Sequence, residues 1–296
     1  MNKRIVTKVV LILFLMVSAC LNSQDNTTCK CPNCNNTKQL TKAQVDEVDV
    51  VLEQLNKKTS KLVSFQAQVE YKFIESLLES EKLKKGVFYY SRFGNDSKLR
   101  LNFKTSRIDD EDEEKYREEY ILLDGADLPS PGRKFEGIWA VQIDYEMESV
   151  RYIQLTEVSD PNKPTDVFDL INNNFPMIGF SKIEDIKKQF DITLVKQKKS
   201  ESEVFTQVHL KVKPNSVYKD NYVSIDFWID KKLGLPVKIV TVSTEPATEP
   251  VESKDVSEIK FIKPEFNKKI DKKVFDLKIP AGFDEPDIQP LSKKSG

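Results

Sequence analysis

The hydrophobic positions of this chain follow two periods. In TKAQVDEVDVVLEQLNKKTSKL the apolar residues recur at three- and four-residue intervals, which predicts an amphipathic helix that starts near Thr41. Beyond Ser64, apolar and polar residues alternate, most clearly in FQAQVEYKF, and this is the period of a strand with one buried face. We therefore expect one helix followed by a series of strands.

The alternation recurs along most of the chain. It is present in KGVFYYSRF, SKLRLNFKT, EEYILLDG, IWAVQIDYE, SVRYIQLTE, DITLVKQ, EVFTQVHLKVK, NYVSIDFWIDKKLGLPVKIVTVST and VSEIKFIK. Turns rich in Gly, Asn, Asp and Lys separate these segments, so the pattern predicts roughly ten or more strands. A flat sheet of that size would leave one broad face unburied, and we therefore expect a continuous antiparallel sheet that curls toward a barrel.

One segment interrupts the strands. The stretch TDVFDLINNNFPMIGFSKIEDIKKQF has apolar residues at helical spacing and is divided into two short helical pieces by a proline and a glycine. Apolar stripes of this kind usually pack in a core, so a buried crossover is one interpretation. The other is a lid over the mouth of the curled sheet. The side chains that such a lid would present to a ligand are Phe168, Phe175, Met177, Ile178 and Phe180.

Residues 1–19 have the features of an export signal. Basic residues precede an uncharged apolar run from Val9 to Val17, which is too short to span a bilayer permanently. The sequence Val-Ser-Ala-Cys that follows matches the bacterial lipobox, which makes Cys20 the acylated first residue of the mature chain. Several acyl chains on one residue would anchor the protein stably, because each buried methylene contributes about 0.8 kcal/mol. Ordinary secretion with an unmodified Cys20 is the alternative.

Three more cysteines, Cys29, Cys31 and Cys34, lie in the polar stretch 20–40. The composition of this stretch predicts a disordered tether between membrane and domain. Three thiolates are available to a metal, but no histidine or second cysteine pair follows to complete a four-ligand shell. In an oxidising compartment three cysteines leave one unpaired. We therefore expect a local disulfide plus a free or intermolecular thiol, and neither a metal nor another cofactor.

Composition and missing motifs exclude several classes of function. Charged residues make up 31% of the chain and the net charge is −1, so no basic excess is present to neutralise nucleic-acid phosphates. The chain has one histidine, His209, and contains no GxSxG, P-loop or HExxH motif. Asp109 and Asp110 are adjacent carboxylates, but they belong to the acidic run IDDEDEEKYREE, which indicates a solvated loop. We therefore expect a binding protein and not an enzyme.

Several segments resemble one family, which includes the lipoprotein carrier LolA, its outer-membrane relative LolB and the outer-membrane lipoprotein-sorting proteins. LVSFQAQVEY resembles the family's opening strand, and KGVFYYSRF is similar to the next strand, which a glycine starts and an arginine closes. ILLDG followed by Trp139 resembles a YLLDG-then-W element, and FDLKIPAGFDE resembles the closing strand. The resemblance spans the chain from the first predicted helix to this closing segment.

The resemblance implies a mainly β (α+β) domain at 41–287, followed by a disordered tail at 288–296. Its fold would be an unclosed antiparallel β-barrel of about eleven strands, covered by an N-terminal helix and a short helical lid. The hydrophobic interior of such a barrel receives the acyl chains of a lipoprotein or lipid, and we include Trp139 among the residues that line it.

Arg92 is the single residue that the resemblance selects. It matches the arginine that secures the closed lid in this family, although Phe93 stands where the family usually has a proline. The other interpretation of Arg92 is an ordinary ion pair at the end of a strand.

The lipobox distinguishes this chain from LolA, which crosses the periplasm as a soluble carrier, and membrane attachment fits LolB better. Leu21 follows Cys20, whereas an aspartate at that position would mark inner-membrane retention. We therefore expect an outer-membrane-anchored protein on the periplasmic face of the envelope that takes part in lipoprotein sorting. The alternative with the same fold is an envelope-stress lipid sensor, or a structural protein that binds an envelope protein partner.

Overall fold

The computed structural model describes residues 42–93, 96–129, 133–156, 183–244 and 254–290. The helices within these ranges are α2 (Lys42–Thr59), α4 (Ile183–Gln189) and α5 (Lys199–Ser202), with 3-10 turns η1 (Ser76–Leu78), η2 (Gly125–Asp127) and η3 (Lys272–Phe275). The strands are β1 (Ser64–Glu75), β2 (Ser80–Phe93), β3 (Asp96–Ile108), β4 (Glu114–Asp124), β5 (Ile138–Asp144), β6 (Ser149–Gln154), β7 (Phe190–Val195), β8 (Phe205–Val212), β9 (Tyr222–Asp230), β10 (Leu235–Ser243), β11 (Val256–Phe266) and β12 (Asp287–Gln289).

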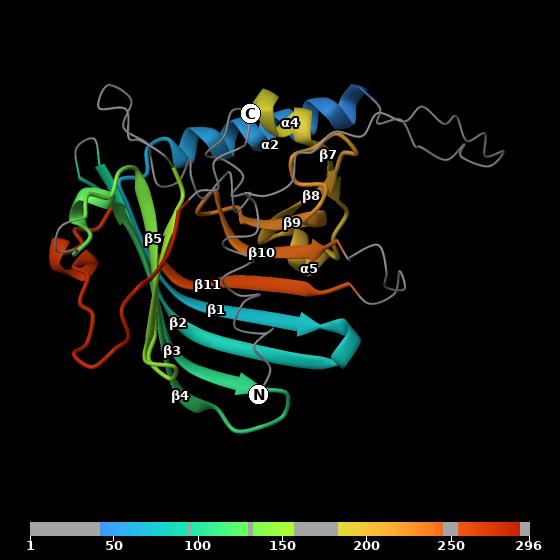
Figure 1. Cartoon of the computed structure of the whole chain (residues 1–296). Helices are drawn as coiled ribbons and strands as arrows, with labels where there is room; N and C mark the ends of the chain where they lie inside the picture. Colours follow the sequence, from blue (N-terminus) through green and yellow to red (C-terminus); the bar gives the residue numbers. More distant parts are fainter. Residues whose placement is uncertain (1–41, 94–95, 130–132, 157–182, 245–253, 291–296) are drawn as a thin grey trace, which may run out of the picture.

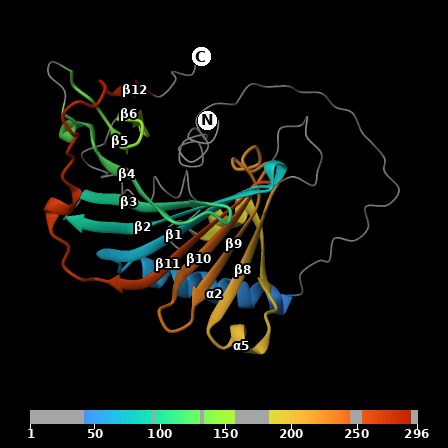
Figure 2. The ribbon, with the colours of Figure 1, turned by 90° about the horizontal axis from the view of Figure 1, so that it is seen from below.

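The strands of the described residues form one twelve-stranded sheet in the order β12-β6-β5-β4-β3-β2-β1-β11-β10-β9-β8-β7. Strands β1–β11 pair antiparallel with their neighbours, and β12 pairs parallel with β6. The edge strands β12 and β7 do not pair with each other, so the curled sheet seen in Figures 1 and 2 stays open. The predicted unclosed antiparallel architecture is confirmed.

The alternation in β1 defines the two faces of the sheet. Its five buried alternate side chains are Phe65, Ala67, Val69, Tyr71 and Phe73. Directly paired residues on antiparallel strands point to the same side. The partners of these five residues therefore extend one face onto both neighbouring strands, β2 and β11. We call it the inner face, because helix α2 packs its apolar stripe into the same hydrophobic core.

Helix α2 begins next to the predicted start and packs on the inner face of the half of the sheet that contains β7 and β10. Its stripe of Val48, Leu52 and Leu55 is buried, as the helical period requires. The helix packs over β7 and β10, and α4 packs over β7. Figure 1 shows both helices across one end of this half of the sheet. None of the helices in the described ranges is long and apolar enough to cross a membrane.

A second hydrophobic core lies on the opposite, outer face of β4–β6. Strand side chains in this core include Ile121, Val141, Ile143 and Tyr152. The side chains that cover them come from the loop before β5 and from the C-terminal segment: Phe135, Leu277, Ile279, Phe283 and Ile288. Strand β5 is therefore buried on both faces along its whole length.

Two sequence predictions are corrected by this second core. Trp139 belongs to it, packed at 4.9 Å between ring centroids against Phe135, and its indole Nε1 donates to the carbonyl of Glu136 at 2.9 Å. It therefore lies on the outer face and does not line the inner one. Strand β12 also continues to Gln289, so the ordered domain extends past the predicted boundary at 287 because Ile288 packs on the outer core.

Candidate functional site

The inner face is the candidate binding surface. It carries buried apolar side chains on every strand from β1 to β11. An aromatic group lies near its middle: Phe65 packs against Phe88 at 5.6 Å, Phe261 at 5.2 Å and Phe266 at 5.2 Å between ring centroids. A largely apolar face inside an open barrel has the chemistry required to bury an acyl chain.

A polar cluster interrupts this apolar face on β2, β4 and β5. Its members are Lys84, Tyr116, Glu118, Tyr120 and Gln142, all buried. The Lys84 ammonium donates to Glu118 Oε2 at 2.5 Å and to the Tyr116 hydroxyl at 3.0 Å. The Tyr116 hydroxyl donates to Glu118 Oε2 at 2.9 Å, while Tyr120 and Gln142 donate to Oε1 at 2.6 and 2.7 Å. Four donors therefore saturate the Glu118 carboxylate.

The electrostatics of the polar cluster follow from this arrangement. Burial by itself raises the pKa of Glu118, but the Lys84 charge and the hydrogen bonds from Lys84, Tyr120 and Gln142 outweigh it, so the pKa lies below its ordinary value of 4.5. The pKa of Tyr116 and Tyr120 is raised, first by burial and then by the Glu118 charge. The cluster thus holds an ionised carboxylate and neutral phenols at neutral pH.

One polar atom of the cluster has no partner. Gln142 is 2% exposed, and its Oε1 is buried without a hydrogen bond. The same amide donates through Nε2 to Glu118 and, at 3.2 Å, to the Tyr120 hydroxyl. A buried acceptor left unsatisfied carries a desolvation penalty of about 1–3 kcal/mol, and in a binding surface this is a position where a ligand can supply the missing donor.

Arg92 lies at the C-terminal end of β2. Its backbone N–H donates to the carbonyl of Val63 at 2.8 Å, and its pairing with Ser97 puts it on the inner face together with Tyr90, two residues before it. The lid residues that it was predicted to hold, Phe168, Phe175, Met177, Ile178 and Phe180, lie outside the described residues. The end of the same predicted segment is described, and it forms α4. Cys20, Cys29, Cys31 and Cys34 also lie outside them.

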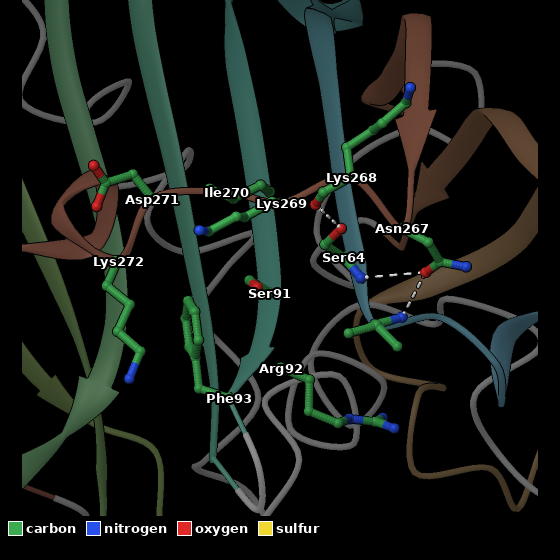
Figure 3. Close-up of a pocket in the computed structure, with 11 residues that line it drawn as sticks. Ser64, Ser91, Arg92, Phe93, Asn267, Lys268, Lys269, Ile270, Asp271 and Lys272 are labelled. Carbon is green, nitrogen blue, oxygen red and sulfur yellow. Dashed lines mark hydrogen bonds between the residues drawn. The ribbon is translucent and has the colours of Figure 1, made fainter.

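A pocket of about 840 Å³ lies beside Arg92, where the chain leaves β11 and passes the start of β1. Asn267 and Ser64 form this junction, since Asn267 Oδ1 accepts from the backbone N–H of Val63 at 2.8 Å and Ser64 Oγ donates to the carbonyl of Lys268 at 2.5 Å. Figure 3 shows the ammonium groups of the lining lysines pointing in different directions, with Arg92 pointing away from Asp271 and Lys272. The basic groups of this pocket therefore do not converge on one anion.

Sequence reasoning missed the polar cluster, although the alternation contains a signal for it. In KKGVFYY, Lys84 occupies the same phase as Phe88 and Tyr90, which is the buried phase of β2. Its partner Glu118 lies 34 residues away, and no local pattern connects them. No group of metal-ligating side chains is present among the residues that the structure describes.

No protein-family model and no curated protein matches the chain. Solved structures resemble it at low similarity. MucB matches at 11% identity with a TM-score of 0.43, over 79% of this chain and 63% of MucB. A putative outer membrane lipoprotein-sorting protein domain from Vibrio parahaemolyticus matches at 11% identity with a TM-score of 0.35, over 77% of this chain and 97% of that domain. A LolA superfamily protein from Nitrosomonas europaea matches at 12% identity with a TM-score of 0.30, over 77% of this chain and 96% of that protein's chain.

The last two structures bear the names of the family that the sequence motifs resemble. The chain spans less than two thirds of the length of MucB. At such identities and TM-scores, the likenesses carry no argument about activity, cargo or partners, and the fold itself rests on the strand order and pairing described above.

Proposed function

We propose that this chain is a membrane-anchored protein of the periplasmic side of the envelope that binds acyl chains of lipoproteins or lipids on its inner face, and that it takes part in lipoprotein sorting to the outer membrane. The observation that carries the proposal is the apolar inner face, which runs across an antiparallel sheet whose edges β7 and β12 stay unpaired. An open edge lets the two halves of the sheet separate as a chain enters. Each methylene that is then buried contributes about 0.8 kcal/mol.

The anchor of this proposal is Cys20. A lipidated Cys20 followed by the polar stretch 20–40 would keep the barrel close to the membrane from which its ligand comes. No enzymatic step is needed, because transfer of an acyl chain between two sites requires only a difference in affinity.

The lid is the second element. In this proposal Phe168, Phe175, Met177, Ile178 and Phe180 cover the bound chain, and Arg92 holds the lid shut from the end of β2. Its position on the inner face at a strand end supports this role. The planar guanidinium would donate to carbonyl or carboxylate oxygens of the lid, and such charge-assisted bonds are among the stronger ones in proteins.

The test is native mass spectrometry of the full chain extracted in mild detergent, followed by titration with a fluorescent fatty acid. Two matched variants accompany the parent protein. Leu101→Asn alters a half-buried residue of the inner face, whereas Val87→Asn alters a half-buried residue of the outer face. We expect a stoichiometric acyl ligand on the parent protein and on Val87→Asn, and binding about tenfold weaker in Leu101→Asn. A parent protein that carries no acyl ligand and takes up no fatty acid would overturn the proposal.

A further inference from the structure

The polar cluster is an unexpected feature of an apolar binding face. A surface that only buried hydrocarbon would not need a lysine and a glutamate, because taking two charges out of water costs several kcal/mol per ion. Here the side chains of Lys84 and Glu118 are 3% and 2% exposed. An apolar patch of the same size would not carry this desolvation cost.

The charges of the cluster are already compensated. Lys84 is paired with Glu118 and hydrogen-bonded to Tyr116, and its Nζ lies 4.7 Å from the centroid of the Tyr116 ring and 5.3 Å from that of Phe103. The nearby Asp144 is 5% exposed, and its Oδ1 accepts from the backbone N–H groups of Glu146 and Met147 at 3.0 and 3.1 Å. Within the cluster, the positive charge of Lys84 is therefore paired with Glu118 and is not left for a carboxylate or a phosphate.

The atom of the cluster that lacks a partner is a hydrogen-bond acceptor. Each of the two Glu118 oxygens accepts two hydrogen bonds, and the hydroxyls of Tyr116 and Tyr120 both donate and accept. Gln142 Oε1 is the atom of the cluster without a partner. The surrounding network holds the amide so that Nε2 faces Glu118, which leaves Oε1 directed away from it.

We propose that the polar cluster recognises a hydrogen-bond donor on the polar part of the acyl ligand, with Gln142 Oε1 as the accepting atom. The donor is an uncharged hydroxyl or amide N–H. An acylglycerol supplies the first, and the acylated amino terminus of a lipoprotein supplies the second. This inference rests on the proposed function and adds the chemical class of the group that the inner face selects.

The position of the cluster also gives the bound ligand a direction. Lys84 and Arg92 lie on the same strand and are eight residues apart, which corresponds to roughly 26 Å. The inner-face positions between them include Phe88 and Tyr90, both buried. The polar end of the ligand would thus lie at the β1–β2 hairpin end of the sheet, with its hydrocarbon extending toward Arg92.

The test compares three uncharged oleoyl ligands as competitors of a fluorescent fatty acid on the full chain. 1-Monooleoylglycerol carries hydroxyls, N-oleoylglycine methyl ester carries an amide N–H, and methyl oleate carries no donor. We expect at least one donor-bearing ligand to bind about tenfold more tightly than methyl oleate. The one that does so identifies the source of the donor.

Two variants test whether Gln142 Oε1 is the atom responsible for the preference for a donor-bearing ligand. Gln142→Met removes the acceptor, and it also removes one hydrogen bond to Glu118 Oε1. Tyr120→Phe removes another hydrogen bond to the same oxygen but leaves Gln142 Oε1 in place. We expect the preference to disappear in Gln142→Met and to persist in Tyr120→Phe. If Gln142→Met does not fold, Gln142→Asn withdraws the amide by one methylene and takes its place.

Equal affinities of the parent protein for all three ligands, or a preference that persists in Gln142→Met, overturn this inference and leave the proposed function standing. If the fluorescent fatty acid binds but none of the three ligands displaces it, this inference is overturned and the proposed function stands. Absence of fatty-acid binding overturns both.

Discussion

Lys84 of β2 and Glu118 of β4 form a buried ion pair across the intervening strand β3, at 2.5 Å between Nζ and Oε2. The pair ties together strands that have no direct backbone pairing. Because it is buried, its energetic effect depends on both partners being present.

Removal of one partner should therefore lower the free energy of unfolding more than removal of both. Lys84→Met or Glu118→Leu alone leaves an uncompensated buried charge, and we expect a loss of about 3–5 kcal/mol in the free energy of unfolding. The double variant should recover a large part of that loss. Urea unfolding of the four proteins measures the coupling energy. Additive losses in the double variant would show that the pair is not coupled.

Gly86 is required by a close approach of two backbones. A Cβ at this position would lie 2.0 Å from the carbonyl oxygen of Asn102 on β3, next to the register shift between Lys85 and Gly86. We expect Gly86→Ala to lower the free energy of unfolding by about 3 kcal/mol, because β2 and β3 must separate locally. Thermal or urea unfolding measures the change.

The matched control for Gly86 is Gly282→Ala. Nothing lies within 4 Å of a Cβ there, and the backbone has φ +92°, so the substitution carries only a dihedral penalty of about 1–2 kcal/mol. A loss in Gly86→Ala no larger than that in Gly282→Ala would exclude the steric explanation.

Arg100 holds the C-terminal segment against the outer face. Its guanidinium donates to the backbone carbonyls of Val274 at 2.9 Å and Asp276 at 3.0 Å, and it forms an ion pair with Glu119. We expect Arg100→Met to expose this segment to trypsin, with cleavage on the order of tenfold faster, while the rest of the sheet stays folded. Arg107→Met is the control, because the partly exposed ion pair of Arg107 with Glu81, at 3.5 Å, joins β3 to β2 and not to the C-terminal segment. Equal cleavage rates in the two variants would contradict the role of Arg100.

His209 should titrate above its ordinary pKa. Its Nδ1 lies 3.0 Å from Asp226 Oδ2, and this hydrogen bond raises the pKa of His209 above 6.5 although partial burial opposes the shift. Since the folded pKa is raised, the stabilisation is fully present below pH 6.5 and is lost as the pH rises through the folded value.

The chain has one histidine, so a single NMR signal of its ring reports this titration. Asp226→Asn should move the pKa of His209 down toward 6.5 and remove the corresponding pH dependence of stability. A midpoint at or below 6.5 in the parent protein would contradict the pairing.

Cys20→Ala tests the anchor. The described domain begins with α2 at Lys42, so the substitution should leave the fold intact while the acyl anchor is lost. We expect the variant to leave the membrane fraction or to keep its signal uncleaved. Quantitative partitioning of Cys20→Ala with membranes would show that lipidation of Cys20 is not the anchor.

Arg92→Leu tests the lid. Without the guanidinium, the closed empty state loses its charge-assisted bonds relative to the open loaded state. We therefore expect the variant to accept a fluorescent fatty acid but to release it several-fold more slowly, measured by stopped-flow transfer to acceptor vesicles. Release at the parental rate would leave Arg92 as an ion pair at a strand end, worth about 1 kcal/mol or less.

The helix and the strands could be predicted from the amino-acid sequence, because helix and strand periods are local properties of the chain. That the curled sheet stays open was implied by the resemblance to a family and not by these periods. The three- and four-residue spacing of Val48, Leu52 and Leu55 predicted α2, and the alternation in FQAQVEYKF predicted which side chains of β1 are buried. These inferences needed no knowledge of distant residues.

The tertiary structure was needed to show which core each side chain of a doubly buried strand packs in and how the buried charges are compensated. In β5 every residue is buried, so alternation could not assign Trp139 to a face; packing of the loop before β5 and the C-terminal segment did. Lys84 finds Glu118 only when β2, β3 and β4 lie side by side. The physical reason is that contacts between residues far apart in sequence depend on strand order, which a local period does not contain.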